Sequence, residues 1–309
     1  MQTPVALIIF NRKDTTEKVI EALRQVKPPK LFVIADGPRP DQPGEAEKCA
    51  ATRAVVDQVD WECEIFKNYS DINLGCGVRP ATGISWVFDQ VEEAIILEDD
   101  CLPHPTFFQF CEELLEKYRD DKRIMQIAAN NFQFSNKYWQ SDCSYYFSRY
   151  CVNWGWASWR RAWQYYDFNI KSWPEIKETI WWKTWLGNQK HTKYWTKKFD
   201  ELYNSPKNDI WDYQWLLSCW IQNGLSITPN INLVSNIGFN EAATHTISEV
   251  SKHGNVPAKA MNFPLKHPAF VISNVEADNF LQNTFHNLTV PMRIKWKIER
   301  SIGKFLPKK

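Results

Sequence analysis

The segment Ala94–Phe108 reads AIILEDDCLPHPTFF and places three consecutive carboxylates, Glu98, Asp99 and Asp100, at the end of an apolar strand. Three adjacent negative charges beside a buried strand repel one another and require a compensating cation. A hard divalent ion such as Mn²⁺ or Mg²⁺ suits such a cluster, because it takes oxygen ligands and can bridge to phosphate oxygens. The simpler alternative is a solvated turn, in which Asp100 caps the helix that the following prolines open.

Around this segment, the first 130 residues alternate between apolar strands and amphipathic helices. This alternation predicts an α/β fold with a mostly parallel sheet flanked by helices. Ligands of such sheets bind outside the carboxyl ends of the strands, so the polar residues that follow each strand are candidate ligand-binding residues. The strands are expected at Val5–Phe10, Leu31–Ala35, Glu64–Phe66, Ala94–Leu97 and Ile124–Ala128, with helices that include Ala81–Val91 and Pro105–Tyr118.

The composition changes after residue 130, because 13 of the 16 tryptophans fall between Trp139 and Trp220. Large rings dominate core burial, so most of these side chains are expected to form an aromatic core. Within the same region, Asp212 is expected to begin an amphipathic helix, since Trp211, Trp215 and Leu216 surround it at helical spacing.

The formal net charge of +1 hides a basic C-terminal tail, residues 290–309, which carries seven Lys or Arg against one Glu. The tail is therefore +6 and residues 1–289 sum to 1 − 6 = −5. An acidic body predicts no nucleic-acid partner. Ile294, Ile298 and Ile302 recur at helical spacing in the tail, which predicts either docking on its own domain, disorder, or peripheral contact with an anionic membrane.

The N-terminus enters an apolar strand directly, with no basic region and no small-residue cleavage site of a signal peptide. No run reaches the roughly 20 apolar residues that span a bilayer. The sequence therefore predicts a cytoplasmic protein, at the inner face of the plasma membrane where the tail binds lipid.

Several motifs together resemble the GT-A (Rossmann-like) glycosyltransferases. AIILEDDCLPHPTFF is similar to the metal-binding segment of the inverting N-acetylglucosaminyltransferases that begin complex N-glycans. NRKDTTEKVIEAL after the first strand, VIADG at the second, NWGWASWRRAW and DIWDYQW continue the resemblance over roughly residues 5–240. The likeness extends to bacterial glycosyltransferase-like proteins that have carried a haemolytic-protein label. It implies a metal-dependent transfer of a hexosyl or N-acetylhexosaminyl group in bacterial polysaccharide biosynthesis.

The resemblance assigns the nucleotide side of the site. It implies that Asp100 is the direct metal ligand, that Asp36 accepts from the base and that Arg12 lies beside the nucleotide as a charge partner. A C-terminal histidine completes the metal or pyrophosphate site in some GT-A enzymes, which makes His245 a second metal candidate, with a surface or core role as the alternative. The nucleotide-binding positions that follow from the resemblance are Arg12, Asp36, Arg79, Glu98 and Asp99.

On the acceptor side, the resemblance implies that Asp212 is the catalytic base of an inverting transfer, which needs a base at the acceptor hydroxyl and charge neutralisation at the leaving group. Trp154, Trp156 and Trp211 are predicted to be platforms for a pyranose, and Gly155 lets the backbone pass close to a ligand. The expected partners are a nucleoside-diphosphate sugar, with a UDP-sugar favoured, and a glycan or lipid-linked acceptor.

The expected organisation has three parts. Residues 1–130 form a nucleotide-sugar-binding α/β half, residues 131–249 form the acceptor-side and catalytic half of the same GT-A domain, and residues 250–309 form a C-terminal extension with the basic tail. A protein that binds nucleotide sugars or carbohydrates on this fold without turnover is the alternative function, because fold does not imply function. A nucleotidyltransferase is disfavoured, since no Gly-rich phosphate loop follows the first strand.

Overall fold

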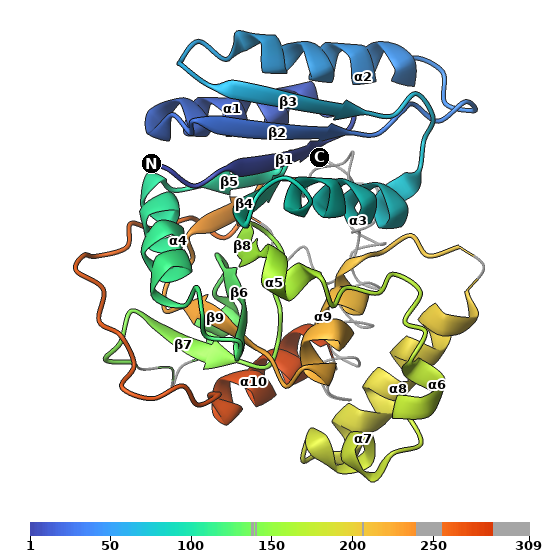
Figure 1. Cartoon of the computed structure of the whole chain (residues 1–309), viewed down its shortest axis with the longest axis vertical. Coiled ribbons are helices and arrows are strands. Elements are labelled where there is room, and N and C mark those ends of the chain that lie inside the picture. The colour runs from blue at the N-terminus through green and yellow to red at the C-terminus, as the bar shows by residue number, and fades with distance from the viewer. Residues whose placement is uncertain (137–138, 140, 206, 239–254, 287–309) are drawn as a thin grey trace, which may run out of the picture.

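The computed structural model describes residues 1–136, 139, 141–205, 207–238 and 255–286 (Figure 1). Its centre is an eight-stranded sheet with the order β3-β2-β1-β4-β8-β6-β9-β7. These strands are β1 (Val5–Ile9), β2 (Lys30–Ala35), β3 (Glu64–Tyr69), β4 (Glu93–Glu98), β6 (Ile124–Ala128), β7 (Tyr145–Ser148), β8 (Trp156–Trp159) and β9 (Leu225–Pro229).

The sheet has a parallel half and a mixed half. β3, β2, β1 and β4 are parallel neighbours, which agrees with their apolar sequences. β8 is antiparallel to both β4 and β6, and β7 is antiparallel to β9, while β6 and β9 are parallel. The predicted α/β fold with a mostly parallel sheet is therefore confirmed. Strands from both sides of residue 130 belong to the same sheet. The division into three parts stays a prediction.

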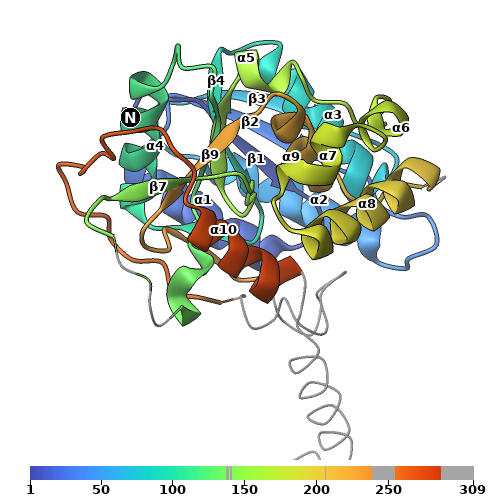
Figure 2. The same cartoon turned by 90° about the horizontal axis from the view of Figure 1, so that it is seen from below.

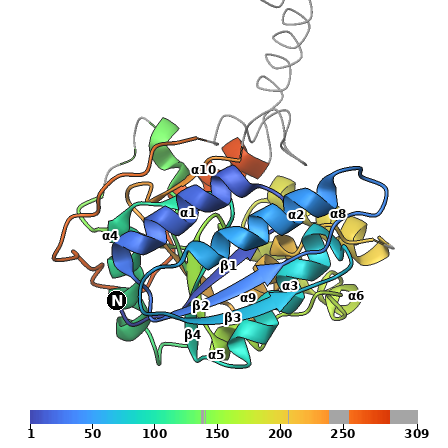
Figure 3. The same ribbon diagram turned by 90° about the horizontal axis from the view of Figure 1, so that it is seen from above.

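Helices cover both faces of the sheet. One face packs against α1 (Lys13–Val26), α2 (Glu45–Ala54) and α4 (Pro105–Lys117), of which α1 and α2 lie side by side in Figure 3. The other face packs against α3 (Gly75–Phe88), α5 (Arg160–Trp163) and α9 (Asp212–Ile221). Two apolar layers thus sandwich the sheet, and its carboxyl edge is left for polar residues.

Helix α3 begins six residues earlier than the expected start at Ala81, although Pro80 lies inside it. The reason is a cap that comes from far along the chain. Both carboxylate oxygens of Asp36 accept backbone N–H groups at the start of the helix, from Leu74 and Gly75, each at 2.9 Å. An unpaired N–H at a helix start needs such an acceptor, and no local pattern revealed this one.

A short strand that the sequence did not predict follows the acidic triplet. β5 (Cys101–Pro103) pairs antiparallel with β10 (Val234–Asn236) in a separate two-stranded sheet. The next helix, α4, is capped by His104, whose Nδ1 accepts from the backbone N–H of Thr106 at 3.2 Å. The simpler interpretation of Asp100 as the cap of this helix is therefore wrong, because His104 fills that position.

An aromatic lobe packs beside the sheet. It is the hydrophobic cluster formed by α6 (Trp173–Ile176), α7 (Ile180–Trp185), α8 (Gln189–Asn204), α9 and the C-terminal α10 (Val275–Leu281) with η4 (Gln282–His286). Figure 2 shows α6, α7, α8 and α9 on one side of the molecule. The expected aromatic core is confirmed, since Trp173, Trp182, Trp195 and Trp220 are fully buried. Among the described residues, no helix is long and apolar enough to cross a bilayer.

Candidate active site

The acidic triplet lies where the parallel half of the sheet meets the mixed half. β4 ends at Glu98, and β5 begins at Cys101, so Asp99 and Asp100 form the connecting turn. The carboxyl end of β1 lies beside them, because β1 and β4 are parallel with Ile8 opposite Glu98. Asp99 and Asp100 are buried, with 4% and 8% of their surface exposed, and Glu98 is half-buried.

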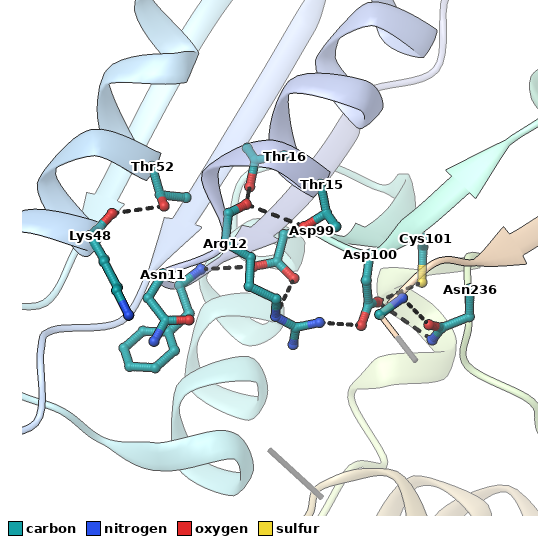
Figure 4. Close-up of polar contacts among 12 residues, drawn as sticks. Asn11, Arg12, Thr15, Thr16, Lys48, Thr52, Asp99, Asp100, Cys101 and Asn236 are labelled. Carbon is teal, nitrogen blue, oxygen red and sulfur yellow. Dashed lines mark hydrogen bonds and ion pairs between the residues drawn. The ribbon is translucent and has the colours of Figure 1, made fainter. Parts of the chain in front are cut away.

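Among the described residues, Arg12 is the cation that pairs with this triplet (Figure 4). Its Nη1 lies 2.5 Å from Oδ2 of Asp100, and its Nε lies 3.5 Å from Oδ1 of Asp99. The backbone is held because its carbonyl oxygen accepts from both hydroxyls of Thr15 and Thr16. Arg12 follows β1 and was expected beside the nucleotide. The structure places it on the carboxylates that would hold the metal.

One guanidinium does not neutralise three carboxylates. Burial, followed by the charges of Asp100 and Asp99, raises the pKa of Glu98 to about 8. Burial also raises the pKa of Asp99 to about 7, against the opposing effect of Arg12. Raised carboxyl pKa values mean that the ionised cluster is short of positive charge, and a hard divalent ion is the kind of ligand that would supply it.

The residues therefore fit a divalent ion by donor chemistry and charge. They do not form a ready-made cage, because no group of three or more His, Cys, Asp or Glu among the described residues is arranged to hold a metal. His245, the second predicted ligand, lies outside the described residues.

The segment that follows β10 closes over Asp100. Asn236 donates from Nδ2 to Oδ1 of Asp100 at 3.5 Å, and the backbone N–H of Ile237 donates to the carbonyl oxygen of Asp100 at 2.8 Å. Gly238 then passes so close that an added Cβ would lie 2.2 Å from Oδ2 of Asp100. Asn236 and Gly238 are site residues that the sequence did not nominate, since only the β5–β10 pairing brings them here.

Asp36 has a structural role in this structure. Its carboxylate accepts four hydrogen bonds, from the backbone of Gly37, Leu74 and Gly75 and from Nδ2 of Asn73, at 2.9 to 3.1 Å. A carboxylate offers about four acceptor sites. Recognition of a base by Asp36 stays a prediction, and it requires one of these bonds to be exchanged.

Arg79 also serves the scaffold. It is buried, its Nε donates to the carbonyl oxygen of Ala35 at 3.1 Å, and its Nη2 donates to both the backbone and the side-chain oxygen of Asn68. These bonds tie the carboxyl ends of β2 and β3 to α3. Burial lowers the pKa of Arg79, which stays far above neutral for a guanidinium. Its predicted nucleotide contact remains untested.

Asp212 is the first residue of α9, as expected, and its Oδ1 accepts from the backbone N–H of Tyr213 at 3.1 Å. Its side chain is half-buried, and desolvation raises the pKa of its carboxyl group. The charge of Asp212 also contributes to the raised pKa of Glu98, which places the two carboxylates within electrostatic reach. A carboxylate whose pKa is raised is a stronger general base.

Close backbone packing positions the segment that leads into Asp212. The segment before α9 lies on the start of α3, where an added Cβ on Gly77 would meet the carbonyl oxygen of Asn208 at 2.0 Å. Asp209 lies beside Gly75, at 3.8 Å from the position that a Cβ would take. The two glycines of the NLGCG sequence, Gly75 and Gly77, were the available signal for this approach.

The tryptophans predicted to bind the acceptor differ in how far their side chains are buried. Trp156, in β8, is 1% exposed and stacks on Trp211 with ring centroids 5.8 Å apart, and Trp211 is 6% exposed. Both belong to the apolar layer under α9, so neither ring has a face free for a sugar.

Trp154 is half-buried and packs edge-on against Phe132. Gly155 has a φ of +74° and passes close to Leu97 and Val234, so its freedom serves packing. The acceptor prediction is kept for Trp154.

The strand order, the antiparallel β8 beside β4 and the acidic triplet at the end of β4 define a GT-A glycosyltransferase-like fold. The chain is 24% identical over 207 residues to an alpha-1,3-mannosyl-glycoprotein 2-beta-N-acetylglucosaminyltransferase of Arabidopsis thaliana. That match covers 62% of this chain and 44% of the plant protein, so the chain spans less than half of its relative's length. No protein-family profile matches the chain.

Solved structures that resemble the chain include further sugar transferases. Mouse xyloside xylosyltransferase 1 has a TM-score of 0.34 at 8% identity, with 71% of this chain and 81% of that chain covered. A galactosyltransferase in complex with donor and acceptor sugar analogues has a TM-score of 0.36 at 10% identity, with 94% and 100% covered. These low TM-scores carry no argument for the chemistry.

Proposed function

We propose that this protein is a glycosyltransferase that moves a hexosyl or N-acetylhexosaminyl group from a nucleoside-diphosphate sugar, with UDP-sugars favoured, to a glycan or lipid-linked acceptor. The observation that carries the proposal is the pairing of Arg12 with the triplet Glu98–Asp100 at the carboxyl edge of the sheet, with the charge of Asp212 near enough to help raise the pKa of Glu98. The sequence similarity to an N-acetylglucosaminyltransferase supports the same conclusion.

On the donor side, Asp100 would hold a Mn²⁺ or Mg²⁺ ion, and Glu98 and Asp99 would face the ribose and keep the turn in place. When bound, the ion neutralises charge on the leaving diphosphate. The role of Asp99 in the turn is supported by its Oδ2, which accepts from the backbone N–H of Phe10 at 3.2 Å and ties the triplet to the end of β1. His245 is proposed as a further ligand of this ion.

On the acceptor side, Asp212 would accept the proton of the hydroxyl that attacks the anomeric carbon, while the bond from that carbon to the nucleoside diphosphate breaks on the opposite face, so a single displacement would invert the configuration. Its raised pKa suits this role. The N-terminal position of Asp212 on α9 helps to fix the carboxylate, because the backbone N–H of Tyr213 donates to its Oδ1. Trp154 would contact the acceptor sugar.

The test is donor turnover and its dependence on the metal. Release of a nucleoside diphosphate is measured from a panel of nucleotide sugars with Mn²⁺ and with a bacterial lipid extract as acceptor. Nucleotide binding is titrated by calorimetry with Mn²⁺ and with EDTA. We expect turnover of at least one donor, and at least about tenfold weaker nucleotide binding in EDTA and in Asp100→Ala.

Three outcomes would contradict parts of the proposal. Equal nucleotide affinity in EDTA removes the metal role, and full-strength binding by Asp100→Ala removes the residue assignment. Metal-dependent binding without turnover of any donor favours the alternative, a nucleotide-sugar-binding protein without catalysis.

We also propose that residues 290–309 make a peripheral contact with an anionic membrane from the cytoplasmic side, because the tail carries a charge of +6. Co-sedimentation with anionic vesicles should be lost when these residues are deleted. A truncated protein that pellets equally well would contradict this.

A further inference from the structure

The oxygens of Asp100 are already engaged by protein groups. Oδ2 accepts from Nη1 of Arg12 at 2.5 Å, and Oδ1 faces Nδ2 of Asn236 at 3.5 Å and Sγ of Cys101 at 3.6 Å. Figure 4 shows Arg12 on one side of Asp100 and Asn236 with Cys101 on the other. A divalent ion bound directly to Asp100 would therefore lie close to the Arg12 guanidinium or displace it.

The space beside Oδ2 is closed as well. Gly238 lies over the ion pair, and an added Cβ there would be 2.2 Å from Oδ2 of Asp100 and 2.7 Å from Nη1 of Arg12. Only 11% of the Asp100 side chain is exposed, whereas 29% of the Arg12 side chain is exposed. Of the two partners, Arg12 is the one with room to leave.

A guanidinium and a divalent ion compete for this carboxylate. Two like charges a few ångströms apart repel strongly, and the repulsion is screened least in a buried site. From this geometry we propose that Arg12 is a resident cation that competes with the divalent ion for Asp100, and that the diphosphate of the donor releases Asp100 by taking the guanidinium. The proposal deepens the proposed function and rests on its metal and nucleotide.

The diphosphate is a suitable partner for the released side chain. Arginine binds phosphate oxygens through two parallel N–H bonds, which gives it a stronger alternative to its single close contact with Asp100. The backbone of Arg12 need not move, because Thr15 and Thr16 hold its carbonyl oxygen at the start of α1. Rotation of the side chain alone would transfer the positive charge from the carboxylates to the phosphates.

This competition makes a thermodynamic prediction. If the nucleotide removes Arg12 from Asp100, nucleotide must strengthen metal binding, and metal must strengthen nucleotide binding by the same factor. Part of that coupling comes from direct contact between metal and phosphate, which does not depend on Arg12. The part due to Arg12 is seen as weak metal binding in the absence of nucleotide.

The experiment measures Mn²⁺ binding by electron paramagnetic resonance without nucleotide and with UDP. Arg12→Gln keeps an N–H donor but removes the charge, so we expect this variant to bind Mn²⁺ alone at least about tenfold more tightly than the native protein does. Arg12→Lys keeps a positive charge that can pair with one oxygen of Asp100, so we expect Mn²⁺ binding without nucleotide to be about two- to threefold tighter than in the native protein. We expect this variant to fold stably. Arg24→Gln removes a half-buried arginine paired with Asp60, and we expect no change in Mn²⁺ binding. UDP should strengthen Mn²⁺ binding less in Arg12→Gln than in the native protein.

The inference is overturned if a folded Arg12 variant binds Mn²⁺ no more tightly than the native protein when both are measured without nucleotide. This conclusion requires that UDP still strengthens Mn²⁺ binding to the native protein. Arg12→Lys provides this comparison even where Arg12→Gln does not fold. If the native protein binds no Mn²⁺ with UDP either, both this inference and the metal role in the proposed function are wrong.

Discussion

Charged side chains gather at the ends of β1 and β4 in the parallel half of the sheet, whereas aromatic rings fill the interior of the lobe formed by α6 to α10. At the sheet edge, Glu98, Asp99 and Arg12 are held with incomplete charge compensation, which is the imbalance that the proposed ion would relieve. In the aromatic lobe, Trp173 and Trp195 are fully buried, and their indole N–H groups are bonded to Asp200 and Gln282.

The difference shows that the buried charges of one region and the buried aromatic rings of the other have different roles. Buried charge with an unfilled requirement marks a site at which a ligand completes the electrostatics. Buried aromatic rings with satisfied N–H groups mark a core. Substitutions in the first region should therefore change function with little effect on folding, and substitutions in the second should do the reverse.

The largest expected effect tests the functional side of this comparison. Asp212→Asn keeps the size of the side chain and its bond to Tyr213 but removes its basicity, so we expect turnover to fall by about 10²- to 10⁴-fold. Nucleotide affinity and melting temperature should stay near native values. The measurement is the steady-state rate of nucleoside diphosphate release.

Asp209→Asn is the matched control, because Asp209 precedes the same helix and lies beside Gly75. If Asp212→Asn turns over at a near-native rate and only Asp209→Asn is inactive, the base is Asp209. If neither is impaired, the site does not use a carboxylate base from this segment.

The next effect tests the structural side. Trp220→Ala removes a fully buried ring whose Nε1 donates to the carbonyl oxygen of Arg149 at 2.5 Å, so we expect a loss of about 3–5 kcal/mol in the free energy of unfolding. Trp154→Ala, at a half-buried ring, should cost clearly less stability and should raise the KM for the acceptor instead. Denaturant unfolding and acceptor titration measure the two quantities. Equal destabilisation by both variants would make Trp154 a core residue.

The smallest effect concerns pH. The pKa values of Glu98 and Asp99 are raised to about 8 and about 7 in the folded protein, so between about pH 4 and pH 8 the folded state binds more protons than the unfolded state. Stability contributed by the protonated groups is fully present at low pH and is lost as pH rises through the folded pKa values. Without metal, the native protein should therefore lose on the order of 1 kcal/mol or more relative to Glu98→Gln between pH 5 and pH 8.

Melting temperatures of the two proteins across this range provide the measurement, with EDTA present. Parallel profiles would show that Glu98 titrates normally, and the charge imbalance at the triplet would then be absent.

The sequence by itself determined the parallel half of the fold and the place of its charges. Apolar strands followed by polar residues put Arg12 and the triplet at one sheet edge, because the carboxyl ends of parallel strands coincide. The start of α9 at Asp212 was equally local, since the helical spacing of its neighbours marked it.

Only the tertiary structure decided what those residues touch. The cap that starts α3 at Gly75 comes from Asp36, and the cover over Asp100 comes from Gly238 through the pairing of β5 with β10. The structure also chose which tryptophans are core, because Trp156 and Trp154 lie two residues apart and differ in burial. Hydrogen bonds and close contacts between segments far apart in the chain leave no periodic trace in either segment, so they become visible only once the fold brings the two together.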